Sequence, residues 1–182
     1  MKYWGKDMEF NILVLDGDGI GPEVVAQGVR VLSTAGKRLG HRFNYTYHAI
    51  GGAGIDTYGN PLRNETIEEA KKSNAILVGA VGGPKWDDPK ATVRPEQAIL
   101  GLRKALDLFA NLRPVKVFPS LKSASAVKPA NIAKVDMVVV RESTGGLYFG
   151  EPKQITETPS GRTAVDSMVY SEEEIRRILK VG

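Results

Sequence analysis

The chain has no cysteine among its 182 residues, and aromatic residues make up only 7% of the sequence. The absence of cysteine excludes disulfide bonds, thiolate catalysis and metal sites built on thiolates. No apolar run approaches the length of a membrane span, and the first ten residues hold no apolar core of signal-peptide length. These absences predict a soluble intracellular protein, which we expect in the cytoplasm.

A strong excess of charge of one sign is also missing. Lysine and arginine number 25 against 21 aspartates and glutamates, which gives a net charge of +4. The basic residues are interleaved with acidic ones, as in Glu172–Arg177, so no stripe typical of nucleic-acid binding stands out. A small positive excess suits a small anionic substrate. The composition is otherwise that of an ordinary globular protein, long enough for one large or two small domains.

Apolar patterning predicts an α/β fold. Short apolar runs predict buried strands, and segments with helical spacing separate them. The predicted buried strands are 11–15, 75–81 and 136–142, with further strands at 43–50, 115–118 and 164–170. Near the end of the chain, Ser171-x-x-Glu174 forms a capping box that predicts the start of a final helix. The glycines between positions 51 and 59 predict a loop there.

A glycine-rich turn follows the first predicted strand. It runs from Asp16 to Gly21, and Pro22 opens a helix directly after it. The dinucleotide fingerprint G-x-G-x-x-G would need glycine where Pro22 stands, and no acidic ribose partner follows at the expected distance. A tight connection between a strand and a helix is the simpler interpretation.

Two central arginines are candidates for binding carboxylates. Arg103 lies inside a helix predicted from Pro95 onward, whereas Arg113 lies in an extended segment, because the residue before a proline avoids helical geometry. The two side chains cannot share one helix face, but they converge if the chain folds back after Asn111. Together they would form a planar clamp for a dicarboxylate. The alternative is a pair of ordinary surface arginines.

Two further segments place candidate groups at the carboxyl ends of predicted strands. Strand 75–81 runs into Gly82-Gly83, and a glycine pair at this position lets the backbone approach a ligand. Strand 136–142 delivers Arg141 to its carboxyl end, and a turn with two glycines leads from there to Tyr148. The alternative for the second segment is a salt bridge at the strand end with a core tyrosine.

These motifs together resemble a known family. The segments are GDGIGPE (17–23), GAVGGPKWD (79–87), LRK (102–104), FANLRP (109–114) and RESTGGLYFGEP (141–152). They resemble the isopropylmalate branch of the decarboxylating β-hydroxyacid dehydrogenases, whose relatives are the isocitrate and tartrate dehydrogenases. GGPKW is characteristic of that branch. The chain departs from the family at Asp16, where proline is usual. The resemblance runs from about residue 11 to 181 and lacks the second half of the family's sequence.

The resemblance implies a truncated two-domain fold with incomplete sheets. Residues 1–108 would begin the cofactor-side domain, and residues 109–182 would begin the substrate and dimerisation domain. The implied activity is the NAD-dependent oxidative decarboxylation of 3-isopropylmalate to 2-oxoisocaproate in leucine biosynthesis, with Mg²⁺ or Mn²⁺. The implied partner is a second copy of the chain, held through an arm at residues 151–170. The alternatives are a non-catalytic protein that dimerises or binds a full-length subunit, and a related tartrate- or isocitrate-type enzyme.

The resemblance also assigns roles to individual residues. Tyr148 would donate the proton in catalysis. The expected substrate-binding residues are Arg103, Arg113 and Arg141 for carboxylates, with Ile99 and Leu100 for the isopropyl group. Both of these apolar residues are equally consistent with a hydrophobic core. The expected cofactor-binding residues are Gly83, Pro84, Lys85, Trp86, Asp87 and Glu96, the last near the nicotinamide. The family's catalytic lysine, metal-binding aspartates and adenosine-binding loop find no counterpart here, so we expect no metal ligands in this chain.

Overall fold

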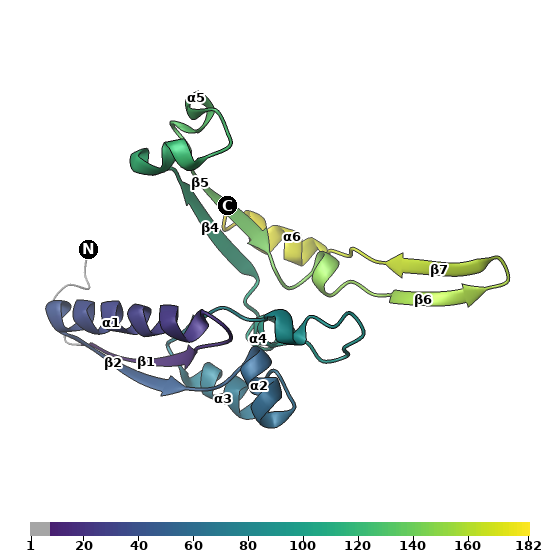
Figure 1. Ribbon diagram of the computed structural model, residues 1–182, viewed down its shortest axis with the longest axis horizontal. Helices are drawn as coiled ribbons and strands as arrows, with labels where there is room; N and C mark the ends of the chain where they lie inside the picture. Colours follow the sequence, from purple (N-terminus) through teal and green to yellow (C-terminus); the bar gives the residue numbers. More distant parts are fainter. Residues whose placement is uncertain (1–7) are drawn as a thin grey trace. The chain divides into compact units, whose positions relative to one another are not determined.

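The computed structural model describes residues 8–182, which divide into two compact units at Leu106–Asp107 (Figure 1). Residues 1–7, part of the segment that lacks a signal-peptide core, lie outside the described residues. Asp107 has a φ of 50°, a left-handed conformation that aspartate tolerates better than most residues. None of the helices among residues 8–182 is long and apolar enough to span a membrane.

A parallel three-stranded sheet forms the centre of the first unit. Its strand order is β2 (His41–Tyr47), β1 (Met8–Leu15), β3 (Ala75–Val78). The second half of the central strand β1, Ile12–Leu15, is buried on both faces, which explains its continuous apolar run. Both flanking strands end before the residues predicted from the sequence, Ile50 and Val81. In β3 the next residue is Gly79, whose N–H still donates to the Leu15 carbonyl at 2.9 Å and where a Cβ would lie 2.1 Å from the Asp16 carbonyl oxygen.

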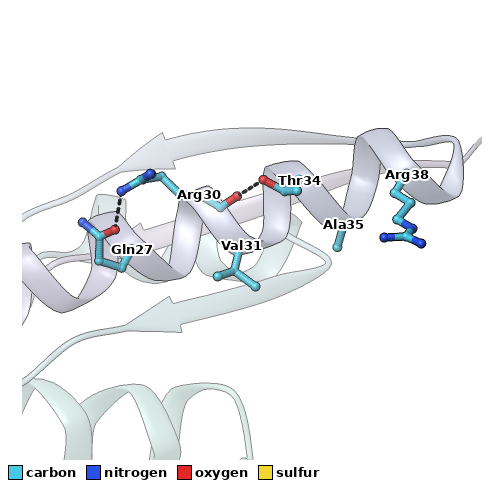
Figure 2. A pocket seen from close by; sticks show the side chains of 6 residues that line it. All are labelled: Gln27, Arg30, Val31, Thr34, Ala35 and Arg38. Atoms are coloured by element: carbon cyan, nitrogen blue, oxygen red, sulfur yellow. Dashed lines mark hydrogen bonds between the residues drawn. The ribbon is translucent and has the colours of Figure 1, made fainter.

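Helices cover both faces of this sheet, because successive side chains of β1 point in opposite directions. Ile12 and Val14 pack with Val25 of α1 (Gly21–Leu39). The outer face of α1 forms a shallow depression (Figure 2). It is lined by Gln27, Arg30, Val31, Thr34, Ala35 and Arg38. All of these residues belong to one helix, so the depression is separate from the loops at the sheet's carboxyl edge.

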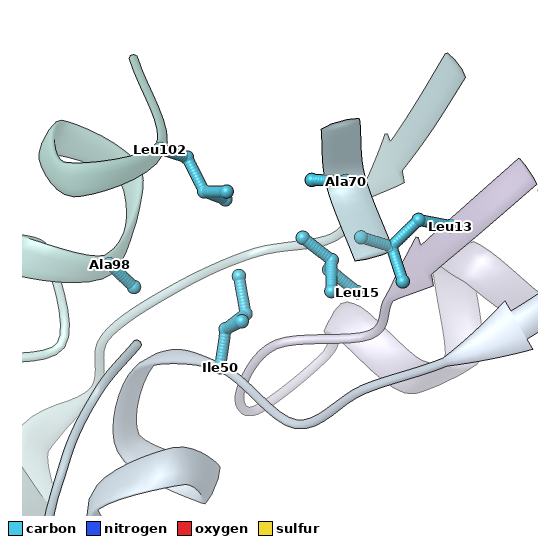
Figure 3. Packing of buried hydrophobic residues seen from close by; sticks show 6 residues of the cluster. All are labelled: Leu13, Leu15, Ile50, Ala70, Ala98 and Leu102. Carbon is cyan, nitrogen blue, oxygen red and sulfur yellow. The ribbon is translucent and has the colours of Figure 1, made fainter. Parts of the chain in front are cut away.

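The opposite face of β1 carries the larger core cluster. Leu13 and Leu15 pack there with residues from three other segments (Figure 3). These are Ile50 after β2, Ala70 of α3 (Asn64–Lys72), and Ala98 and Leu102 of α4 (Gln97–Ala105). The predicted helix from Pro95 therefore forms, but it ends at Ala105 rather than near Phe109.

The prediction of a loop at residues 51–61 is wrong for residues 51–58. Gly51–Tyr58 forms the helix α2, despite three glycines that disfavour helix. The backbone N–H groups of Gly52 and Ala53, in its first turn, donate to the carboxylate of Asp18 at 2.8 and 2.7 Å. A carboxylate at this end stabilises a helix, so a tertiary contact overrides the local propensity.

The second unit contains two antiparallel pairs of strands. β4 (Ala110–Lys116) pairs with β5 (Asp136–Glu142), and β6 (Lys153–Thr158) pairs with β7 (Gly161–Asp166). Strands were predicted at 115–118 and 164–170, so β4 begins earlier than expected and β7 ends earlier. The second unit also contains three short helical segments between or after these strands. They are η2 (Pro119–Ala124), α5 (Pro129–Ile132) and η3 (Gly146–Tyr148).

The final helix α6 (Glu172–Leu179) confirms the predicted capping box. The Ser171 hydroxyl accepts a hydrogen bond from the Glu174 N–H at 3.2 Å, and the Glu174 carboxylate accepts one from the Ser171 N–H at 2.7 Å. These two bonds satisfy backbone donors that the first turn of a helix leaves unpaired.

The sheets of the second unit leave much apolar surface uncovered. Met137, Val138 and Val139 in β5 are all exposed, and so is every residue of β6 and β7. Sheets with unpaired edges and exposed apolar faces are incomplete as folding units. The structure therefore has the incomplete α/β architecture that the resemblance implies.

The packing of β1 generates a prediction about stability. Leu13→Ala should lower the free energy of unfolding of the first unit by about 2–5 kcal/mol, because it leaves a cavity in the core. The matched control is Leu39→Ala, which removes an exposed leucine at the end of α1 and should change stability by less than about 0.5 kcal/mol. Urea unfolding followed by circular dichroism measures both changes. Equal effects of the two substitutions would contradict the assigned core.

Candidate functional site

A buried carboxylate organises the carboxyl edge of the parallel sheet. Asp18, only 3% exposed, lies in the turn after β1. Besides the two N–H groups of α2, it accepts a hydrogen bond from the Gly82 N–H at 2.7 Å, and its own N–H donates to the Ala80 carbonyl at 2.7 Å. One side chain therefore ties together the loops that follow all three strands. These hydrogen bonds join the three loops at one shared acceptor.

Glycine is required where these loops meet. Gly51 has a φ of +67°, and a Cβ there would lie 2.6 Å from Asp18 Oδ2. A Cβ on Gly52 would lie 2.4 Å from the ring of Trp86, so the indole packs directly on the helix backbone. The glycines thus allow close contact between α2, the Asp18 turn and the loop after β3.

The loop expected to bind the cofactor is anchored to α2. It contains the short helix η1 (Pro84–Trp86). Lys85 Nζ lies 2.5 Å from Asp56 Oδ2, and the Trp86 indole N–H donates to Asp56 Oδ1 at 3.4 Å. The hydrogen bond from Lys85 lowers the pKa of the Asp56 carboxyl below its usual value. Asp56 therefore acts as the attachment point of the loop.

Most of the residues expected at the cofactor lie close together. Gly83, Pro84, Lys85 and Trp86 form the loop, and Asp87 ends it in an exposed position. The Glu96 carboxylate would lie 2.8 Å from a Cβ on Gly82, so it reaches the glycine pair. Ligands of open α/β sheets bind at the carboxyl edge of the strands, so this group of residues remains a candidate cofactor site.

The substrate-binding residues expected on α4 lie in the first unit. Ile99 packs against the core cluster of β1, so the core interpretation holds for part of its surface. Leu100 and Arg103 are half-buried. Because Arg113 and Arg141 belong to the second unit, the convergence of all three arginines remains a prediction.

Arg113 and Arg141 lie on the same face of the β4–β5 pair. Asn111 is opposite Arg141 in the register, and Arg113 lies two residues further along β4. Residues opposite each other, or two apart on one strand, share a face of an antiparallel pair. Arg113 Nε donates to Asn111 Oδ1 at 3.1 Å, and the Arg141 guanidinium carbon lies 4.9 Å from the centre of the Tyr148 ring. This face therefore combines two cations with a phenol.

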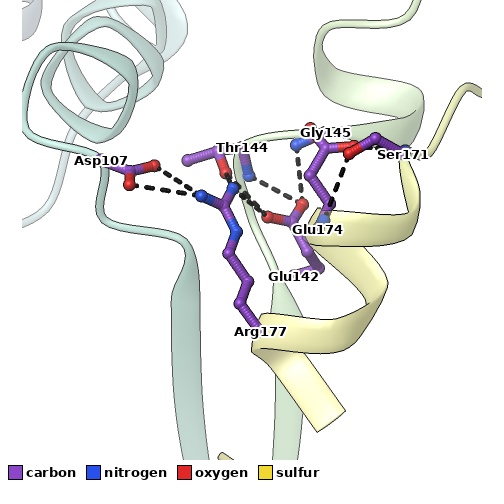
Figure 4. A network of polar contacts seen from close by, with 7 residues as sticks. All are labelled: Asp107, Glu142, Thr144, Gly145, Ser171, Glu174 and Arg177. Carbon is purple, nitrogen blue, oxygen red and sulfur yellow. Dashed lines mark hydrogen bonds and ion pairs between the residues drawn. The ribbon is translucent and has the colours of Figure 1, made fainter. Parts of the chain in front are cut away.

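A polar network that was missed in the sequence lies at the end of β5, on the face opposite to Arg141, because Glu142 is the next residue along the strand (Figure 4). The Glu142 side chain is 7% exposed and accepts hydrogen bonds from the Thr144 N–H at 2.9 Å, the Thr144 hydroxyl at 2.7 Å and the Gly145 N–H at 2.7 Å. Arg177 Nη2 lies 3.3 Å from it. A salt bridge at the strand end was one alternative for this segment, but nothing in the sequence pointed to its partner 35 residues later.

The environment of Glu142 favours its ionised form. Burial raises the pKa of Glu142, but hydrogen bonds from the Thr144 hydroxyl, the Gly145 and Thr144 N–H groups and Arg177 outweigh it. The pKa therefore lies below its usual value. Asp18 was likewise missed, because the sequence shows an acidic residue in the turn but no sign that distant N–H groups surround it.

The residues present do not fit the divalent metal that the resemblance implies. Among residues 8–182, no three His, Cys, Asp or Glu side chains are close enough together to hold a metal ion.

Comparison with known proteins defines the class. Residues 11–182 match the sequence profile of the isocitrate/isopropylmalate dehydrogenase family, and the chain belongs to this family. It is 54% identical over 177 residues to a 3-isopropylmalate dehydrogenase of Oleidesulfovibrio alaskensis, covering 96% of this chain and 49% of that protein. It is 51% identical over 176 residues to a 3-isopropylmalate dehydrogenase of Bacillus subtilis, covering 96% and 48%. The chain spans about half the length of these curated relatives.

Comparison with solved structures agrees with this family assignment. The chain resembles an isocitrate dehydrogenase from Methylococcus capsulatus with a TM-score of 0.72 at 26% identity, covering 94% of this chain and 46% of that one. It also resembles a β-decarboxylating dehydrogenase from Thermococcus kodakarensis with a TM-score of 0.61 at 32% identity, covering 94% and 44%. Fold and family therefore agree with the motifs.

The Asp18 contacts predict a large effect of an isosteric change. Asp18→Asn replaces one acceptor oxygen by an NH₂ group that faces backbone donors. We expect a loss of about 1.5–3 kcal/mol in the stability of the first unit, measured by urea unfolding, for each charge-assisted bond that is broken. Asp16→Asn, two residues earlier at a half-exposed position, is the matched control and should change stability by less than about 0.5 kcal/mol. A smaller effect at Asp18 than at Asp16 would be inconsistent with this role.

The lowered pKa of Glu142 predicts a dependence of stability on pH. Its ionised form stabilises the second unit fully above the usual glutamate pKa, and this contribution is lost as the pH falls through the lowered folded-state pKa. Glu142→Gln should therefore flatten the acid side of the stability curve. Unfolding measured at a series of pH values from about 3 to about 7 tests this. The exposed Glu157→Gln on β6 is the control, and it should change the curve less than Glu142→Gln does.

Proposed function

We propose that the chain takes part in the NAD-dependent oxidative decarboxylation of 3-isopropylmalate to 2-oxoisocaproate. The observation that carries this proposal is the face on which Arg113 and Arg141 lie together, with Tyr148 against Arg141. The three residues come from segments that match the family's motifs, and the chain belongs to that family. The chain spans about half the length of its relatives, so the full reaction is itself something we propose.

The arginines would bind and orient the substrate. Each guanidinium can form two parallel hydrogen bonds to a carboxylate, so Arg113 and Arg141 suit a substrate with two carboxylates. Arg103 would add a third cation. Leu100, with the part of Ile99 that the core leaves uncovered, would contact the isopropyl group. An apolar contact there favours isopropylmalate over a substrate with a polar group in that position.

Tyr148 would supply a proton after decarboxylation. The hydroxyl-bearing carbon would give up a hydride, and its hydroxyl would give up a proton to a base from outside this chain. The carboxylate on the neighbouring carbon would then leave as CO₂, and the enolate carbon that results would take up a proton. NAD, when bound, is the hydride acceptor. The phenol of Tyr148 lies against a carboxylate-binding cation, so a bound substrate would come within reach of its proton.

The loop of Gly83, Pro84, Lys85, Trp86 and Asp87, with Glu96 beside it, would receive the nicotinamide. The tight anchoring of this loop through Asp56 supports that role, because a rigid loop orients a cofactor at little cost in entropy. The first unit would then be the cofactor side and the second unit the substrate side. Metal ligands would come from outside this chain.

A second candidate function is supported by the β6–β7 hairpin. All of its residues are exposed, which suits an arm that contacts another subunit. On this proposal residues 151–170 join two copies of the chain, or one copy to a full-length subunit, in the cytoplasm.

An assay of the chain alone and in a mixture tests the proposal. Alone, with NAD, 3-isopropylmalate and Mg²⁺ or Mn²⁺, we expect no NAD reduction, because arginine binding without metal ligands and a base does little for the chemical step. Mixed with a full-length subunit inactivated at its own tyrosine, the chain should restore turnover by supplying Tyr148.

Arginine variants make this test specific. Arg113→Lys or Arg141→Lys should weaken turnover in the mixture by about 1.5–3 kcal/mol of transition-state stabilisation, since lysine lacks the planar fork. Arg42→Lys, an exposed change on β2, should have no effect. Turnover by the chain alone would show that the catalytic groups are misassigned, and no turnover in either preparation would contradict the proposed function.

A further inference from the structure

Arg177 of α6 lies at the centre of the polar network (Figure 4). Its Nη1 lies 3.0 and 3.3 Å from the two carboxylate oxygens of Asp107. Its Nη2 contacts Glu142 Oε1 at 3.3 Å and donates to the Thr144 hydroxyl at 2.5 Å. The guanidinium carbon also lies 4.7 Å from the centre of the Phe109 ring. With 22% of its side chain exposed, Arg177 is well shielded for an arginine.

These contacts reach both ends of the segment that carries the candidate substrate residues. Asp107 and Phe109 precede β4, whereas Glu142 ends β5 directly after Arg141. Thr144 begins the turn that leads to Tyr148. A single guanidinium therefore holds the start of one strand to the end of its neighbour and to the turn beyond.

The turn itself is held from two sides. The Glu142 carboxylate accepts the N–H groups of Thr144 and Gly145. From the other side, the Glu174 carboxylate of α6 would lie 2.8 Å from a Cβ on Gly145. The turn has little room to shift once α6 is in place, so the path from Arg141 to Tyr148 is determined by the attachment of this helix.

We propose that Arg177 is a positioning residue for the substrate site. By fixing Glu142 and Thr144, it sets the placement of Arg141 over the Tyr148 ring, and with it the distance between a bound carboxylate and the phenol. The expected effect of Arg177 on turnover rests on the proposed function. Its effect on the placement of Arg141 can be measured without any turnover.

Only arginine suits this position. The guanidinium uses one terminal nitrogen for Asp107 and the other for Glu142 and Thr144. A lysine ammonium is a point charge and cannot span both sides in a planar fork. Arg176, the preceding residue, provides a matched control because it forms an exposed ion pair with Glu172 on the same helix. The two arginines thus differ in their contacts but not in charge or helix.

The test is nuclear magnetic resonance of arginine side chains in the full chain, labelled with ¹⁵N. In the unchanged protein, the Arg141 Nε–H resonance should show the ring-current shift of a guanidinium stacked on Tyr148, and Tyr148→Leu gives the unstacked reference. Arg177→Met should move the Arg141 resonance to the reference position. Arg176→Met should leave it in place. A folded Arg177→Met protein with an unchanged Arg141 resonance would overturn the proposal.

Two further measurements complete the test. If Arg177→Met does not fold, as judged by circular dichroism, Arg177→Lys decides, because it keeps the charge and the aliphatic stem. A shifted Arg141 resonance in the lysine variant supports the proposal, and an unchanged one refutes it. In the mixture with a tyrosine-inactivated subunit, Arg177→Met should lower kcat by about 10²-fold, as expected for a displaced catalytic group, and Arg176→Met should not. If the unchanged chain restores no turnover, the proposed function fails, while the Arg141 resonance still decides the role of Arg177.

Discussion

The first unit depends on one buried carboxylate. Asp18 accepts hydrogen bonds from the backbone of two segments that lie 34 and 64 residues away in the sequence. Without it, the first turn of α2 and the loop after β3 would each leave a buried N–H group without an acceptor, which is costly in a protein interior. The shape of the sheet's carboxyl edge follows from this single acceptor. The glycines around it are a consequence, since they allow the three loops to come close enough to share it.

The parts of the fold that depend on local patterns were predictable. The continuous apolar run of β1 indicates a central parallel strand, and Ser171 with Glu174 indicates the start of α6, because both signals lie within a few residues. The helix α2 was not predictable, because its stability comes from Asp18 and not from its own glycine-rich sequence. The close approach of Gly79 to Asp16 after β3 is likewise brought about only by the folded chain.

The candidate site shows the same division. Arg113, Arg141 and Tyr148 were recognisable from their motifs, but their common face depends on the pairing register of β4 and β5, which no local pattern specifies. Asp18 and Glu142 lie inside the motifs but were given no role there, and Arg177 lies outside them. All three interact with groups far away in the sequence. Their importance follows from burial and from the number of partners that each one satisfies. The candidate substrate residues were therefore easier to find than the shielded polar groups at the ends of their segments.

The stability of the β6–β7 hairpin depends on whatever molecule covers it. A two-stranded ribbon with every residue exposed gains little from its own packing and is at best marginally stable in water. The two strands are in equilibrium between a paired and an unpaired state. Any molecule that binds only the paired state shifts this equilibrium toward pairing by mass action. The fraction of chains with an ordered ribbon therefore rises with the concentration of whatever covers it. Dilution should loosen this ribbon before it affects the buried core of the first unit.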